Sequence, residues 1–307
     1  FDKYNFSGAV EKLEVLKETI PEPDLRQQLN FVYLLAKSYE GWDALDFRRA
    51  YEYMDMLKTQ LERDSRTHRR FLLMDYLEKI REQTGILESL QCIPTLINNK
   101  RNTEILRQSR LIHPLMFTMF QNAKIREYQE KYDMATLLLY RLLEMIEQRR
   151  LAGYNIDVSN ADYSCMRMNT RRCPGASGLK GDDKVRWLRD EVNHVKTEIF
   201  KRENSGYLQD QISLLEGFII LRALNDPVVR DINYLKKMRS MVYLRNNSIF
   251  AHGLGPVSRS DYYKFRDFVI ESFKMFCSIE KINFENIEKL VDYIKPMDSK
   301  YYSSGKD

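Results

Sequence analysis

The sequence is poor in the residues that interrupt helices. Its 307 residues include 12 glycines and 8 prolines, where average usage would supply about 21 and 15. Leu, Lys, Glu, Arg and Met, which favour helices, are abundant instead. Strict alternation of apolar and polar residues, the pattern of a half-buried strand, is nowhere sustained. We therefore expect an all-α protein.

Long hydrophobic runs and cysteines are also scarce. No stretch approaches the roughly 18 apolar residues that a membrane-spanning helix needs. The four cysteines are too few for a disulfide framework, and their spacing is not that of a zinc site. No secretory hydrophobic segment opens the sequence. We therefore expect a cytoplasmic protein that has no membrane partner, no metal and no cofactor.

One long break interrupts the helical pattern, between Gly153 and Asp182. It is about twice the length at which structureless connections become uncommon. Its glycine-rich end lacks the Gly-Lys-Ser/Thr order of a phosphate-binding loop, because Lys180 is followed by Gly181 and an aspartate. The sequence therefore predicts an inserted loop here, without a nucleotide cradle.

Positive charge is concentrated between Arg230 and Arg266. This segment has eight basic and two acidic residues, a net charge of +6, whereas the whole chain has +5. Six tyrosines and phenylalanines lie among these charges. Cations attract phosphates and flat rings stack on unpaired bases, so the pattern suits single-stranded nucleic acid. A pair of solvated helices with buried rings would have the same composition.

Within this segment, Arg245 and His252 have six residues between them. The spacing alone is uninformative, because each of the four histidines follows an arginine with four to six residues between. The surroundings distinguish this pair. Asn246 follows the arginine, Gly253 follows the histidine, and Ile249-Phe250-Ala251 lies between them, late in the chain and after a predicted helix.

A second stretch has a related pattern: Phe120-Gln-Asn-Ala123 through Tyr132-Asp-Met-Ala135, then Leu139-Tyr140-Arg141, Leu143-Glu144 and Gln148. Together, the two stretches resemble the HEPN ribonucleases of type III CRISPR systems, accessory nucleases that carry a CARF sensor domain. The resemblance extends over roughly Leu111 to Ile294. It implies a helical bundle, an endoribonuclease activity on single-stranded RNA, and a role in antiviral defence.

The resemblance assigns catalytic roles to three residues. It makes His252 the acid and base, Arg245 the cation that stabilises the transition state, and Asn246 a positioning group for phosphate or ribose. Cleavage by a 2′-hydroxyl needs a proton shuttle and a cation but no metal. The resemblance also leads us to expect that neighbouring cations bind the RNA: Lys236, Lys237, Arg239 and Arg259.

Geometry adds a condition to this assignment. On one helix, Arg245 and His252 would share a face but lie about 10 Å apart along the axis. In the family, a two-fold homodimer brings two Arg–His sets into one cleft, which resolves that separation. A histidine that only caps a helix end is the non-catalytic interpretation of His252.

The resemblance also implies a domain division. Residues 1–100 would form a helical connector region, and residues 101–307 a HEPN-like ribonuclease domain with an inserted loop at 153–182. Relatives begin with a Rossmann-like sensor that binds cyclic oligoadenylate. Because no strand–glycine turn–helix unit precedes Phe6 and the first residue is Phe1, we expect a fragment without that sensor. Cyclic oligoadenylate would act only through it.

The alternative is a non-catalytic helical module, a degenerate HEPN domain that binds RNA or a protein. Such a module would use the basic surface between Arg230 and Arg266 but would not need His252. Its binding would depend mainly on total charge and on salt.

Overall fold

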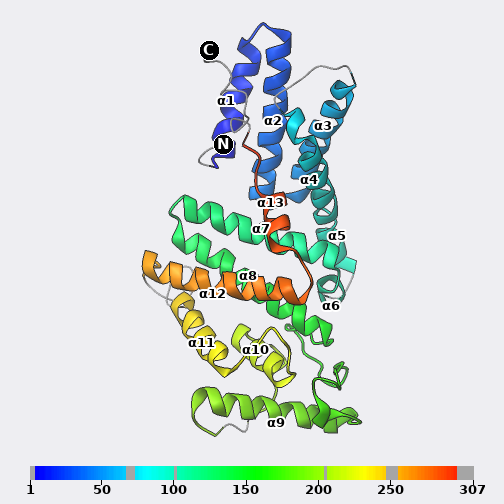
Figure 1. Ribbon diagram of the computed structural model, residues 1–307, viewed down its shortest axis with the longest axis vertical. Coiled ribbons are helices and arrows are strands. Elements are labelled where there is room, and N and C mark those ends of the chain that lie inside the picture. The colour runs from blue at the N-terminus through cyan, green and yellow to red at the C-terminus, as the bar shows by residue number, and fades with distance from the viewer. Residues whose placement is uncertain (1–3, 67–72, 100–101, 204–205, 247–254, 296–307) are drawn as a thin grey trace. The chain divides into compact units, whose positions relative to one another are not determined.

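The computed structural model describes residues 4–66, 73–99, 102–203, 206–246 and 255–295 (Figure 1). Every regular element within these ranges is a helix, which confirms the predicted all-α class. The contacts divide the chain into two compact units. One comprises Phe1–Leu96 together with Asn286–Asp307, and the other comprises Ile97–Glu285.

In the first unit, helices that follow one another along the chain pack side by side (Figure 1). They are α1 (Phe6–Thr19), α2 (Pro23–Asp43), α3 (Phe47–Ser65), the 3-10 helix η1 (Met74–Tyr76), α4 (Leu77–Leu90) and the start of α5 (Ile93–Asn99). Pro23 suits the first turn of α2, where its missing N–H costs nothing. The Asp46 side chain accepts a hydrogen bond from Arg49 N (3.1 Å) and so caps α3.

The C-terminal part of the described chain packs into this first unit. The Tyr293 ring lies 4.4 Å from the Tyr39 ring. Gln83 Nε2 donates to the carbonyl of Leu290 (2.8 Å), and Tyr39 Oη donates to Gln83 Oε1 (2.9 Å). Ile294 N in turn donates to Tyr39 Oη (2.9 Å). These contacts group the described residues from Asn286 onward with the first unit.

The second unit is arranged around α8 (Figure 1). Its helices are α6 (Asn102–Leu106), α7 (Ser109–Tyr128), α8 (Tyr132–Gly153), the 3-10 helix η2 (Pro174–Ala176), α9 (Gly181–Phe200), α10 (Leu214–Ala223), α11 (Ile232–Asn246), α12 (Arg259–Ile279) and the start of α13 (Phe284–Val291). Helices α7, α10 and α12 pack against α8. Aromatic rings join α7 to α12, with Phe117 4.8 Å from Phe273.

The long loop between α8 and α9 is bonded to its surroundings. Arg167 N donates to the Tyr154 carbonyl (2.7 Å), next to the end of α8. Ala161 N donates to the Asp210 carbonyl (2.8 Å), which lies between α9 and α10. The loop therefore forms part of the second unit, and one of its ends is fixed beside the last turn of α8.

Candidate nucleic-acid interface

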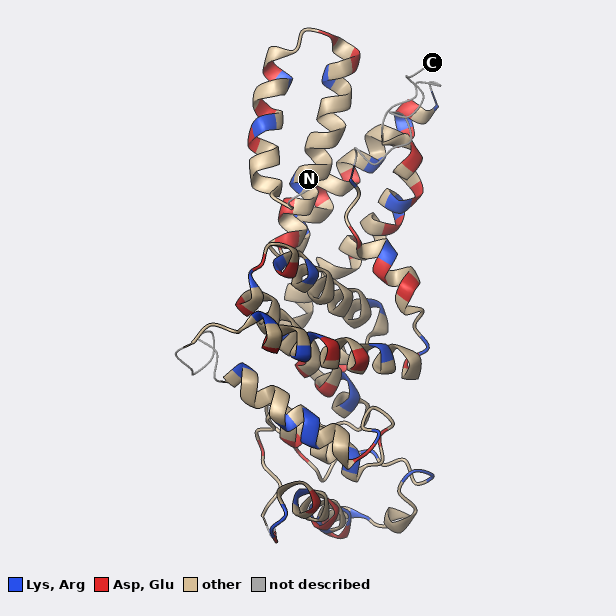
Figure 2. Cartoon of the chain, turned by 60° about the vertical axis from the view of Figure 1, so that its left-hand side comes forward, with Lys and Arg blue, Asp and Glu red and all other residues tan. Residues whose placement is uncertain are grey.

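Helix α11 presents a basic surface at the predicted site. Its sequence contains four Lys and Arg residues and no acidic residue. In Figure 2, α11 carries only the blue of Lys and Arg, whereas α9 carries both blue and red. Arg245 and Asn246 are the last two residues of α11. His252 lies outside the described residues.

Arg245 is held against an aromatic ring of α8. Its Cζ lies 4.2 Å from the ring centroid of Tyr140, and its Nη1 donates to Asn246 Oδ1 (3.1 Å). Such a cation–π contact is worth about 0.5–2 kcal/mol and orients the guanidinium plane. Within the described residues Arg245 has no carboxylate partner. Its remaining N–H groups are therefore available to a phosphate.

The same part of α8 contains a cluster of polar side chains. Burial, followed by the charge of Glu144, raises the pKa of Tyr140, and the charge of Arg245 opposes this shift. Two turns further along α8, burial and Glu144 raise the pKa of Glu147 well above its ordinary value, although Arg141 acts in the opposite direction. Burial therefore favours the neutral form of the Glu147 carboxyl.

A cavity of about 850 Å³ lies beside α11, and we call it the α11 cavity. Its polar lining includes predicted site residues from α11 and two charged residues from α12: Lys236, Arg239, Asn246, Asp261 and Lys264. Arg239 also lies over the Phe200 ring, 4.8 Å from its centroid. The structure thus brings two of the predicted RNA-binding cations and the predicted positioning amide to one cavity.

The other two predicted RNA-binding cations do not line this cavity. Lys237 Nζ lies 3.9 Å from Glu271 Oε2 and 5.5 Å from the Phe268 ring. Arg259 Nη2 donates to Tyr263 Oη (3.4 Å) at the start of α12. These contacts are local to α11 and α12.

Sequence reasoning did not assign a role to Asp133 or Tyr140, although both belong to the second stretch that carries the resemblance. Asp133 Oδ1 accepts a hydrogen bond from Val257 N (2.9 Å). The backbone just after the segment 247–254 is therefore fixed to the start of α8, and Arg245 just before it is fixed to the middle of α8. These two contacts with α8 join residues that are distant in the sequence, so no local sequence pattern could have indicated them.

The Arg189–His194 pair, which has the same loose spacing, makes ordinary helix-surface contacts. Arg189 Nη2 lies 2.9 Å from Asp190 Oδ1. His194 Nε2 lies 3.4 Å from Glu198 Oε1, and its side chain is 70% exposed. His68, a third histidine with this spacing, lies outside the described residues.

Two kinds of site are not found in the described part of the chain. No three His, Cys, Asp or Glu side chains gather there as metal ligands would. None of the helices there combines the length and the apolar character needed to cross a membrane.

Comparison with protein families identifies both parts of the chain. The family described as the Csm6 HEPN domain matches residues 105–276, more than half of the chain, and the Csm6 6H domain matches residues 1–87. No curated protein matches. The first match includes α8, α11, Arg245 and His252. The chain therefore belongs to the Csm6 HEPN family of CRISPR-associated proteins, whose members are generally ribonucleases.

Proposed function

We propose that this chain is a metal-independent endoribonuclease that cleaves single-stranded RNA in type III CRISPR defence. The observation that supports it most is the Arg245–Asn246 pair at the end of α11. It precedes His252 within a segment that matches the Csm6 HEPN domain. The contact with Tyr140 holds the guanidinium without neutralising it.

In the proposed reaction, the 2′-oxygen of the RNA attacks the adjacent phosphorus and the bond from phosphorus to the 5′-oxygen breaks. The 2′-hydroxyl loses its proton to a base, and the leaving 5′-oxygen gains one from an acid. Histidine suits both transfers because its ordinary pKa is about 6.5. Arg245 would bind the phosphorane oxygens with its planar fork, and Asn246 would position phosphate or ribose.

We propose that the working form is a homodimer in which two Arg–His sets share one cleft. Within each chain, residues 101–307 would form the ribonuclease domain and residues 1–100 the connector. Activation by cyclic oligoadenylate would act through a sensor domain. If both residues lay on one helix, Arg245 and His252 would be about 10 Å apart along its axis, too far to act as one tight pair, and this supports a composite site.

Cleavage of a fluorescent single-stranded RNA in EDTA tests the proposal. We expect cuts in the all-ribose strand, with 2′,3′-cyclic phosphate and 5′-hydroxyl ends, and none in a 2′-O-methyl strand of the same sequence. Cleavage of the methylated strand, or cleavage that EDTA abolishes, would contradict the mechanism. RNA that the protein binds but does not cut would favour the non-catalytic module.

A further inference from the structure

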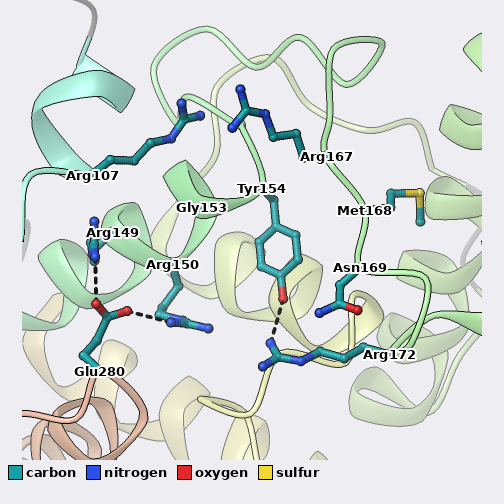
Figure 3. Close-up of a pocket in the computed structure, with 10 residues that line it drawn as sticks. All are labelled: Arg107, Arg149, Arg150, Gly153, Tyr154, Arg167, Met168, Asn169, Arg172 and Glu280. Atoms are coloured by element: carbon teal, nitrogen blue, oxygen red, sulfur yellow. Dashed lines mark hydrogen bonds and ion pairs between the residues drawn. The ribbon is translucent and has the colours of Figure 1, made fainter.

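A second cavity, of about 460 Å³, lies at the C-terminal end of α8, where the long loop begins (Figure 3). Five arginines and one carboxylate line it: Arg107, Arg149, Arg150, Arg167, Arg172 and Glu280. We call it the arginine cavity. All of its lining residues belong to the second unit, and it shares none of them with the α11 cavity.

Carboxylates balance only part of this positive charge. Glu280 lies 2.7 Å from both Arg149 Nη2 and Arg150 Nη1. Buried Asp226 lies 2.7 Å from Arg150 Nη2 and 3.7 Å from Arg172 Nη1. Glu104 is a third carboxylate whose charge acts on Arg107, so five guanidiniums against three carboxylates leave a local excess of two positive charges.

The excess is greatest where the helix end and the loop meet. The guanidiniums of Arg107 and Arg167 face one another in Figure 3. Burial and then the charge of Arg167 lower the pKa of Arg107, an effect that Glu104 opposes. Arg167 is exposed, and its side chain makes no hydrogen bond or ion pair with any described residue. An anion between the two guanidiniums would relieve their repulsion.

Several donors in the cavity are unused. Arg107 Nε donates to the Ala152 carbonyl (2.7 Å) and its Nη2 donates to Asn155 Oδ1 (2.6 Å). Its Nη1 makes no hydrogen bond with a described residue and is available to a ligand. Asn169 Oδ1 accepts from Arg171 N (3.1 Å), so the Asn169 amide nitrogen remains as a donor on the cavity wall.

We propose that the arginine cavity binds the phosphate group of a nucleotide, either free or within an RNA strand. Planar guanidiniums match the oxygens of phosphate with paired, charge-assisted hydrogen bonds. The volume lies in the range of about 300–1,000 Å³ typical of small-ligand sites, so there is room for more than the phosphate alone. Tyr154 and Met168 add apolar surface to the wall. This inference does not rest on the proposed nuclease activity, because it concerns binding at a separate site.

The test measures binding to the full chain by calorimetry at constant ionic strength, with four probes: inorganic phosphate, adenosine 5′-monophosphate, adenosine, and a ten-nucleotide 2′-O-methyl RNA. The variants are Arg167→Ala and Arg171→Ala. Both arginines are exposed and come from the same loop, but only Arg167 lines the cavity. Neither side chain holds the fold through a described contact, so both variants should fold.

We expect Arg167→Ala to weaken binding of a phosphate-bearing probe by about 10-fold or more, and Arg171→Ala to change it less than about two-fold. Adenosine should not bind. An Arg167-dependent signal with the monophosphate would identify a free nucleotide as the ligand, and one with the RNA alone would identify the strand. Equal losses in the two variants, or no binding of any phosphate-bearing probe to the unaltered chain, would overturn the proposal.

Discussion

Two Arg–His pairs of similar spacing, Arg107–His113 and Arg245–His252, lie in the same match to the Csm6 HEPN domain, and their arginines make different contacts. Arg107 Nε donates to the Ala152 carbonyl, one of the last carbonyls of α8 that has no partner within the helix. His113 Nε2 lies 3.4 Å from Glu280 Oε2. Arg245 contacts a neutral ring and its neighbouring amide instead. Both residues of the first pair make contacts that hold the fold, and Arg107 keeps only Nη1, whereas Arg245 uses only Nη1 and keeps its other donors.

This difference explains why spacing alone fails as a sign of catalysis. An arginine can bind a ligand only through the N–H groups that the fold leaves free. Arg107 uses two of its three nitrogens at the end of α8, whereas Arg245 uses one. The residues around Arg245 distinguish the two pairs: Asn246 follows the arginine directly, and its side chain accepts a hydrogen bond from Arg245. The predictions below test whether this contrast is functional.

The largest effect should follow from Arg245→Ala. We expect single-turnover RNA cleavage to fall by about 100-fold or more, because a cation on the developing phosphorane charge is lost. Arg245→Lys should not restore full activity, since an ammonium lacks the planar fork. Arg189→Ala is the matched control and should cleave like the unaltered chain. Equal losses in Arg189→Ala and Arg245→Ala would remove the distinction between the pairs.

The next effect concerns the stability of the Arg107–His113 region. Glu280→Gln should lower the free energy of unfolding by about 3–5 kcal/mol, because two largely buried arginines lose their shared carboxylate. Chemical denaturation at neutral pH measures this change. A loss below about 1 kcal/mol would mean that the ion pairs of Glu280 with Arg149 and Arg150 contribute little to stability.

The same carboxylate predicts a pH dependence. Burial alone would raise the pKa of Glu280, but His113, Arg149 and Arg150 together lower it from 4.5 to about 2. Because the folded-state pKa is the lower one, the stabilisation is complete above about pH 4.5 and is lost as the pH falls towards 2. Thermal unfolding between pH 5 and pH 2 should show a smaller decline for Glu280→Gln. Parallel curves for the two proteins would contradict this assignment.

Arg107→Ala should have a smaller structural effect. It removes one of two donors to the Ala152 carbonyl, which keeps its hydrogen bond from Asn155 N (3.0 Å), and it removes the donor to Asn155 Oδ1. We expect a loss of about 1–1.5 kcal/mol in unfolding free energy. The exposed neighbour Arg110 provides the control, since surface substitutions of this kind usually change stability by less than about 0.5 kcal/mol. A similar loss in Arg110→Ala would show that Arg107 has no special role at the helix end.

The smallest effect should be seen in the salt dependence of RNA binding. Lys236 and Arg239 line the α11 cavity, whereas Lys237 lies beside Glu271. Removing both lining cations should reduce the slope of log K against log salt by about 1.4, at about 0.7 per phosphate contact on a single strand. Lys237→Ala should change this slope by less than about 0.35, which is half the value of one phosphate contact. The reverse order would place the RNA on the other side of α11.

The sequence predicted what depends on local pattern. The scarcity of glycine and proline indicated the all-α class, and the two stretches around Tyr140 and Arg245 indicated the family. It could not predict contacts between distant residues. The hydrogen bond from Gln83 to Leu290 and the meeting of Arg107 with Arg167 depend on how helices pack, and no local pattern encodes either. His252, which carries the proposed proton transfer, lies outside the described residues, so its role remains a prediction.

The most direct test of the contrast between the pairs is single-turnover cleavage of single-stranded RNA in EDTA by His252→Ala and His194→Ala. Both variants remove one imidazole, and His194 is an exposed histidine paired with Glu198 on a helix surface. The account predicts that His252→Ala loses about 100-fold or more, with an unchanged melting temperature and unchanged dimerisation, while His194→Ala retains full activity. Full cleavage by His252→Ala, or an equal loss in His194→Ala, would contradict the assignment of the ribonuclease site.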